Sequence, residues 1–172
     1  NEAWGCRASF SPTTLRAGAA GGNSTVQIGS MPGCPWSATT GTSWITITGA
    51  GRGTGATQVG LVVAPNSGPA REGSLAISGS SLPVAQASGC TYAVSASIHA
   101  VGAAGGTGSV SVSTAGGCPW SAASNATWII LEAPTGVGSG SMTFTVVASE
   151  GGARSGTLTA AGQVITITQA SR

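Results

Sequence analysis

Few side chains in this chain could perform acid–base or nucleophilic chemistry. It has six Arg, four Glu, one His and one Tyr, with neither Asp nor Lys. A Ser–His–acid triad would have to use His99 with one of the four Glu residues. A glycosidase pair of carboxylates could be drawn from Glu132 and Glu150. Either site needs its groups to converge, so the elements that carry them decide whether the chemistry exists.

The chain is an internal duplication. At an offset of 84 residues, Cys6 aligns with Cys90, and the segments 18–22 and 33–38 (GAAGG and GCPWSA) recur at 102–106 and 117–122. Beyond a Gly-rich loop that is one residue shorter in the second copy, the offset becomes 83, and Arg71 aligns with Arg154. We therefore divide the chain into an N-terminal extension (1–5), a first copy (6–88) and a second copy (89–172).

Comparison of the copies argues against catalysis. His99 stands opposite Leu15, and we interpret it as a solvated strand or loop residue. Neither Glu132 nor Glu150 has an acidic counterpart, and we interpret both as solvated loop carboxylates. The Gly-Ala-Ala-Gly-Gly segments lack the Lys and the strand–helix context of a phosphate loop, and we interpret them as turns. The sequence predicts no catalytic residue, no cofactor and no enzyme activity.

The cysteines could form disulfides or bind a metal. No CxxC motif exists and the single His has no matching partner, which argues against a metal site. Four Cys allow three pairings, and a bond within one copy should recur in the other, which selects Cys6–Cys34 and Cys90–Cys118. Each bond closes a loop of about 28 residues, worth roughly 3–3.5 kcal/mol in chain entropy. Disulfides require an oxidising compartment, so we expect an extracellular or cell-surface protein.

Each copy has the pattern of a β-sandwich. Short runs alternate apolar and small or polar residues, and Gly, Ser, Pro and Asn clusters separate them. The alternating apolar positions are Val26/Ile28, Val59/Leu61/Val63, Leu75/Ile77, Leu82/Val84, Val110/Val112, Met142/Phe144/Val146, Leu158/Ala160 and Ile165/Ile167. About seven strands in each copy predict an all-β protein of two tandem immunoglobulin-like sandwiches, each with one internal disulfide.

Charge and hydropathy exclude other classes. The six Arg residues are scattered and the isoelectric point is near 8.6, which does not fit a nucleic-acid footprint. No apolar run approaches the ~20 residues of a membrane helix, so we expect no membrane insertion. The chain starts at Asn1 without a signal-peptide pattern, and we expect any targeting segment to have been removed.

Ordered motifs in both copies resemble those of the BACON domain family. The first copy has Cys34-Pro35-Trp36, Ser43-Trp44-Ile45, Asn66, Arg71-Glu72-Gly73-Ser74-Leu75 and Val84-Ala85-Gln86. The second has Cys118-Pro119-Trp120, Thr127-Trp128-Ile129, Arg154-Ser155-Gly156-Thr157-Leu158 and Ile167-Thr168-Gln169, with Ser149 in place of Asn66. The resemblance implies a bacterial, exported, immunoglobulin-like sandwich. Family members are often appended to glycan-active enzymes and are proposed to bind carbohydrate or mucin.

The aromatic residues offer the best candidate contacts. Trp36 and Trp120 share strand parity with Cys34 and Cys118, which favours packing against the disulfide. The same alternation turns Ile45 and Ile129 inward, so that Trp44 and Trp128 face outward, either to cap the sandwich or to contact a ligand or subunit. Arg71 and Arg154 precede Gly at matching turns, where we expect them to bond backbone carbonyls. Asn23 and Asn125 begin glycosylation-like triplets, which indicate only that these segments are exposed.

Two non-catalytic functions remain. The chain has no Lys and few charges to protect its sheet edges, which favours association with copies of itself in a surface filament or layer. The extension Asn1-Glu2-Ala3-Trp4-Gly5 carries an apolar anchor, Trp4, that could insert into a neighbouring subunit. The alternative is a carbohydrate-binding module that binds a polysaccharide or mucin through Trp44 and Trp128. We favour assembly on the sequence alone.

Overall fold

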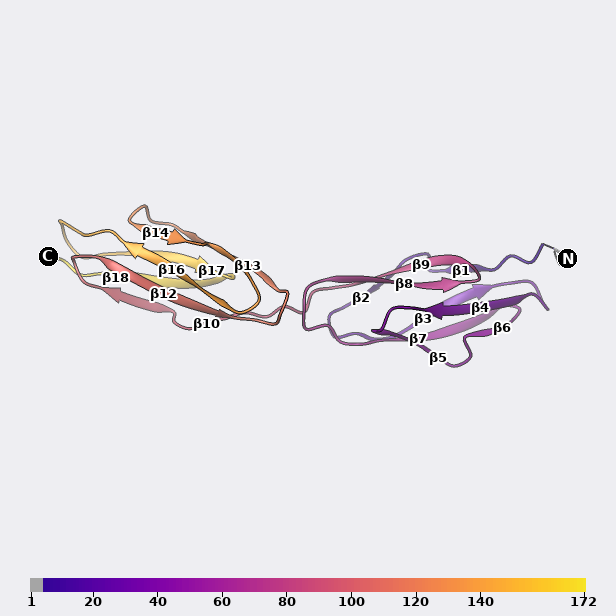
Figure 1. The fold of residues 1–172 in the computed structure, drawn as a ribbon. Coiled ribbons are helices and arrows are strands. Elements are labelled where there is room, and N and C mark those ends of the chain that lie inside the picture. Colours follow the sequence, from indigo (N-terminus) through magenta and orange to yellow (C-terminus); the bar gives the residue numbers. More distant parts are fainter. Residues whose placement is uncertain (1–4) are drawn as a thin grey trace. The chain divides into compact units, whose positions relative to one another are not determined.

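The computed structural model describes residues 5–172, and every regular element in this part of the chain is a β-strand. The chain divides into two compact units, Asn1–Gly89 and Cys90–Arg172, which we call domain 1 and domain 2 (Figure 1). Domain 1 contains β1 (Ser9–Ser11), β2 (Leu15–Ala17), β3 (Gly22–Gly29), β4 (Pro35–Thr40), β5 (Ile45–Thr48), β6 (Arg52–Thr54), β7 (Thr57–Val63), β8 (Arg71–Ile77) and β9 (Ser80–Gln86). Domain 2 contains β10 (Ala93–Val94), β11 (Ile98–Val101), β12 (Gly106–Ser113), β13 (Pro119–Ser124), β14 (Ile129–Glu132), β15 (Thr135–Val137), β16 (Gly140–Val146), β17 (Arg154–Ala160) and β18 (Gln163–Gln169).

Both domains have the same two-sheet topology. In domain 1 the sheets run β1-β3-β7-β5 and β2-β9-β8-β4-β6. In domain 2 they run β10-β12-β16-β14 and β11-β18-β17-β13-β15. All pairs are antiparallel except β2 with β9 and β11 with β18, which are parallel. The predicted all-β class and the two sandwiches are confirmed, with extra short strands at the sheet edges.

The alternation seen in the sequence produces the cores. The inward residues of β3, β7, β8 and β9 are buried in domain 1, and those of β12, β16, β17 and β18 are buried in domain 2. The alternating apolar positions named from the sequence, from Val26 to Ile167, are all among the buried residues. Because side chains alternate between the two faces of a strand, each of these strands buries one face and exposes the other.

Both predicted disulfides are confirmed. Cys6 is bonded to Cys34 and Cys90 to Cys118, with Cα–Cα distances of 5.5 and 5.7 Å. Cys34 directly precedes β4, and Cys118 directly precedes β13. Each bond therefore ties the segment before the first strand to the start of a strand in the opposite sheet.

Three expectations need correction. Glu132 is the last residue of β14 and does not lie in a loop. His99 is not solvated: it lies half-buried in β11, with its ring edge-on to Phe144 at a centroid distance of 5.2 Å. This follows from register, because His99 pairs with Ile167 as Leu15 pairs with Val84, and both positions face inward. Arg71 and Arg154 begin strands β8 and β17 and do not lie at turns. No helix in residues 5–172 is long and apolar enough to span a membrane.

Candidate functional site

The two tryptophans singled out in the sequence lie under arginine side chains. Trp44 and Trp128 directly precede β5 and β14, and both are half-buried against the core of their own domain. The guanidinium carbon of Arg71 lies 4.6 Å from the centroid of Trp44, and that of Arg154 lies 4.4 Å from the centroid of Trp128. A guanidinium at this distance is attracted to the aromatic face and occupies it.

The same guanidinium groups are held by further hydrogen bonds. Arg71 donates from Nη2 to the carbonyls of Ala64 and Pro65, and from Nε to Oε1 of Gln86 at 2.9 Å. Arg154 repeats this pattern in domain 2, with Gln169 as the side-chain acceptor at 2.7 Å. The expected bonds to backbone carbonyls are therefore present. Each Arg–Trp pair joins the two sheets of its domain, since the arginine lies on the five-stranded sheet and the tryptophan precedes an edge strand of the four-stranded one. The pair also leaves less of the indole for a ligand.

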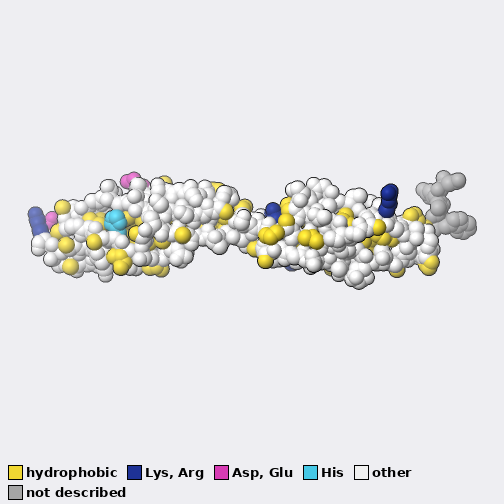
Figure 2. All heavy atoms as spheres, turned by 90° about the horizontal axis from the view of Figure 1, so that it is seen from below, with side chains coloured by type: hydrophobic (Ala, Val, Ile, Leu, Met, Phe, Trp, Pro, Cys, Tyr) yellow, Lys and Arg dark blue, Asp and Glu magenta, His cyan; other side chains and the backbone are white. Residues whose placement is uncertain are grey.

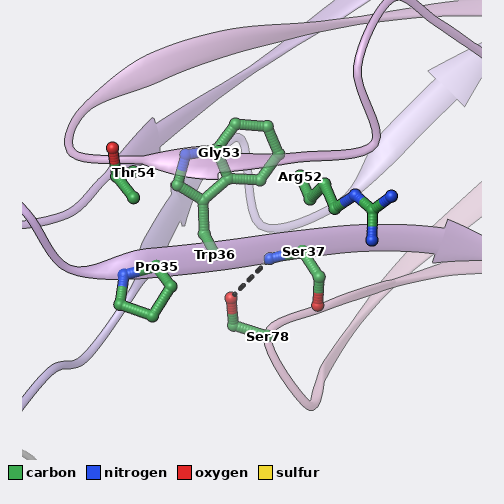
Figure 3. A pocket seen from close by; sticks show the side chains of 7 residues that line it. All are labelled: Pro35, Trp36, Ser37, Arg52, Gly53, Thr54 and Ser78. Carbon is green, nitrogen blue, oxygen red and sulfur yellow. Dashed lines mark hydrogen bonds between the residues drawn. The ribbon is translucent and has the colours of Figure 1, made fainter.

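A hollow that the sequence does not predict lies on the outer part of the five-stranded sheet of domain 1. This hollow has a volume of about 530 Å³ and lies over the antiparallel pair of β4 and β6 (Figure 3). Its lining residues are Pro35, Trp36, Ser37, Arg52, Gly53, Thr54 and Ser78. β6 is an edge strand of three residues in a Gly-rich segment, which is too short for alternation to reveal in a sequence.

Trp36 is the most buried residue named in this lining, and its indole points into domain 1. Trp36 is 7% exposed and belongs to the core of domain 1. Gly53 lies directly against the ring, since a Cβ at this position would lie 2.7 Å from Cζ2 of Trp36. A larger residue at Gly53 would push β6 away from the indole, so this glycine allows the close approach.

The rim is polar. The backbone N–H of Ser37 donates to Oγ of Ser78 at 3.3 Å, as the dashed line in Figure 3 shows. Arg52 and Thr54 lie on either side of the indole in the same view, and both are exposed. The hollow thus combines the exposed ring of Pro35 with three hydroxyl groups and one guanidinium. Sites for small ligands are typically built in this way, from apolar surface and a few placed polar groups.

Domain 2 has the same backbone arrangement with a different lining. Trp120 pairs with Gly136 as Trp36 pairs with Gly53. At offset 83, Thr135, Val137 and Ala161 replace Arg52, Thr54 and Ser78. Val137 is 70% exposed. Both domains therefore have the Trp–Gly pair, but the arginine and the hydroxyls of Thr54 and Ser78 belong to domain 1 and have no equivalent in domain 2.

The two indoles also differ in their hydrogen bonds. Nε1 of Trp120 donates to the carbonyl of Gly138 at 2.9 Å. Nε1 of Trp36 is buried and has no hydrogen-bond partner among the described residues. Since most buried donors are satisfied, an unpaired one in the lining of a hollow needs an explanation.

The groups considered for catalysis do not converge. Glu132 accepts a hydrogen bond from Thr143, Glu150 pairs with Arg172 at 2.7 Å, and His99 packs on Phe144. Residues 5–172 contain no group of three or more His, Cys, Asp or Glu residues that could hold a metal. Of the extension predicted to contact a subunit, residues 1–4 lie outside the described part, and Gly5 is exposed with φ = 54°.

Comparison with solved structures gives distant likenesses. The chain is similar to a Bacteroides ovatus GH5 xyloglucanase in complex with a XXXG heptasaccharide, at 22% identity and a TM-score of 0.42, over 48% of this chain and 19% of that one. It is similar to domains 5–6 of the S-layer protein SbsC at 12% identity and a TM-score of 0.38, over 96% and 97% of the two chains. It is also similar to the Yersinia pseudotuberculosis adhesin InvE, at 13% identity and a TM-score of 0.43, over 95% of this chain and 58% of that one. None of these likenesses bears on ligand or activity.

No curated protein matches the sequence. The family model BACON, described as "Putative binding domain, N-terminal", matches residues 35–87 and 119–170. The two matches cover more than half of the 172 residues and fall one in each domain. They begin at the Pro-Trp pairs that open β4 and β13 and continue to the end of each sandwich. The chain therefore belongs to the BACON family and carries two copies of its domain.

Proposed function

We propose that this chain is a non-catalytic, extracellular binding module whose domain 1 binds carbohydrate in the hollow above Trp36. The family is described as a binding domain, and two disulfides fit an oxidising compartment outside the cytoplasm. The observation that carries the proposal is the lining of the hollow, where the exposed ring of Pro35 lies beside three hydroxyl groups and a guanidinium.

These groups suit the chemistry of a sugar ring. A pyranose presents C–H groups on its faces and hydroxyl groups around its edge. The exposed ring of Pro35 can contact the sugar ring, while Ser37, Thr54 and Ser78 can exchange hydrogen bonds with its hydroxyls. Trp44 and Trp128 are less suited, because an arginine already occupies one face of each indole.

The test is a glycan array probed with the whole chain and with two matched variants. Thr54→Tyr places a ring over the hollow and should abolish the signal. Val137→Tyr makes the corresponding change in domain 2 and should leave it within about twofold of the original. A broad array with no signal for the unaltered chain, or equal binding by both variants, would show that the hollow is not a carbohydrate site.

Association with copies of the same chain is the second candidate. Domain 2 exposes Ile98 (66%), Ile130 (51%) and Val137 (70%) on β11, β14 and β15. All three strands are sheet edges, and none carries a Lys or a Pro. Exposed β-branched residues on an edge without such protection favour pairing with another chain. The extension Asn1–Gly5 remains a second possible contact for such an assembly, with Trp4 as its anchor.

A further inference from the structure

We infer that the hollow of domain 1 selects an acidic saccharide, whose carboxylate or sulfate group pairs with Arg52. This inference rests on the proposed function and adds the chemical class of the ligand. It concerns domain 1 alone. The argument depends on the charge of the lining, on the state of the other arginines and on the comparison between the two domains.

The lining of the hollow has one cation and no anion. Arg52 is exposed, and the structure records no hydrogen bond or ion pair for its side chain among residues 5–172. Its guanidinium presents several N–H donors in a planar fork that matches the geometry of a carboxylate or sulfate. An anionic group that entered the hollow would meet no carboxylate there to repel it.

Most other arginines already have partners. Arg71 and Arg154 are used in the indole and carbonyl contacts, and Arg172 pairs with Glu150 at 2.7 Å. Arg16 lines a separate hollow together with Glu72, which supplies a competing carboxylate. Arg16 also lines a second hollow, which has neither an acid nor a hydroxyl side chain. The hollow of Arg52 differs from both because it has no acid and has three hydroxyl groups.

Further donors surround the same space. Oγ of Ser78 already accepts a hydrogen bond from the backbone of Ser37, which leaves its own O–H free to donate. Thr54 lies on the same side of the indole as Nε1 of Trp36, the buried donor without a partner (Figure 3). That nitrogen is enclosed, so a bridging water or a small movement of β6 would have to connect it to a ligand. An acceptor-rich ligand such as an acidic sugar suits a lining dominated by donors.

Domain 2 provides the internal comparison. Its equivalent positions, Thr135, Val137 and Ala161, have neither the charge nor two of the hydroxyls, and its indole N–H already has a partner. If Arg52 only protected an edge strand from pairing, a charge anywhere on β6 would suffice and no ligand preference would follow. The ligand preference is therefore the property to measure.

The experiment compares three soluble polymers by affinity electrophoresis at two salt concentrations. Polygalacturonate carries carboxylates, dextran sulfate carries sulfates, and dextran is neutral. We expect binding to at least one acidic polymer and none to dextran. Arg52→Gln should weaken that binding about tenfold or more, since hydrogen bonds to charged groups are the strong ones. The control Arg16→Gln removes the same charge from β2 and should change affinity less than twofold.

The outcomes separate the two claims. If Arg52→Gln loses binding to an acidic polymer and Arg16→Gln does not, the inference is supported. The polymer that binds then identifies carboxylate or sulfate as the group recognised. Equal losses in both variants would show general charge attraction and overturn it. Binding to dextran alone, unaffected by Arg52→Gln, would overturn the inference and leave the carbohydrate-binding proposal standing. If the chain binds none of these polymers and no glycan on the array, both claims fail.

Discussion

At the scale of single residues, the amides of Gln86 and Gln169 hold three segments of each domain together. Nε2 of Gln86 donates to the carbonyls of Gly18, Ala19 and Ala64, while Oε1 accepts from Arg71. Gln169 repeats the pattern with Gly102, Ala103 and Val147. Both side chains are almost completely buried. The sequence marked these glutamines as recurrent but carried no signal for their partners, which come from distant turns.

Gln86→Met tests this role. The methionine has nearly the same length but no amide, so buried carbonyls and the Nε of Arg71 lose a partner. We expect the free energy of unfolding of domain 1 to fall by about 2–3 kcal/mol. Urea unfolding followed by far-UV circular dichroism measures the change. Gln27→Met, on the exposed face of β3, is the control and should stay within about 0.5 kcal/mol of the original. A small effect at Gln86 would mean that water replaces the amide.

At the scale of elements, period-two alternation predicted the long strands and missed the short ones. In β7 and β16, inward residues such as Leu61 and Phe144 are buried as the pattern required. β6 has three residues with Gly53 at its centre, so it shows no alternation, and the sequence predicts a Gly-rich loop there. Because β6 forms one side of the hollow, the candidate site could not be predicted without the fold.

The disulfides are the covalent links between the sheets of each domain. Each bond joins residues 28 apart, so its loss enlarges the unfolded ensemble. The pair Cys90→Ala and Cys118→Ala should lower the stability of domain 2 by about 3 kcal/mol. Differential scanning calorimetry of the whole chain, with and without dithiothreitol, measures it. Reductant should no longer affect domain 2 in this variant while it still destabilises domain 1. Unchanged stability would mean that the cores alone hold the sheets.

At the scale of the whole molecule, the chain has an unusually neutral surface. Figure 2 shows only a few charged side chains on the face that it presents, among many uncharged polar and apolar ones. The sequence has ten Arg and Glu residues in 172, and this composition led to the assembly hypothesis. Composition alone could not show which edges are apolar, because that depends on register. In domain 2, register turns Ile98 and Ile130 outward while His99 and Ile129 turn inward.

The assembly candidate is tested by adding charge at these edges. The triple variant Ile98→Lys, Ile130→Lys and Val137→Lys should be monomeric if edge pairing drives association, because a Lys on an edge strand opposes pairing. Sedimentation velocity and electron microscopy measure the state of the protein. The control Ser109→Lys, Ser155→Lys and Gln163→Lys adds the same charge on inner strands of domain 2 and should associate as the unaltered chain does.

A third variant, lacking Asn1–Gly5, distinguishes the two proposed contacts. If only this truncation abolishes association, the extension makes the contact and the edges do not. If only the triple lysine variant at the sheet edges abolishes association, the apolar edge strands of domain 2 are sufficient for the contact. Loss in the inner-strand control as well would indicate general repulsion between positive chains, since all the added charges have the same sign. An unaltered chain that stays monomeric at every concentration would contradict self-association and leave ligand binding as the role of this tandem.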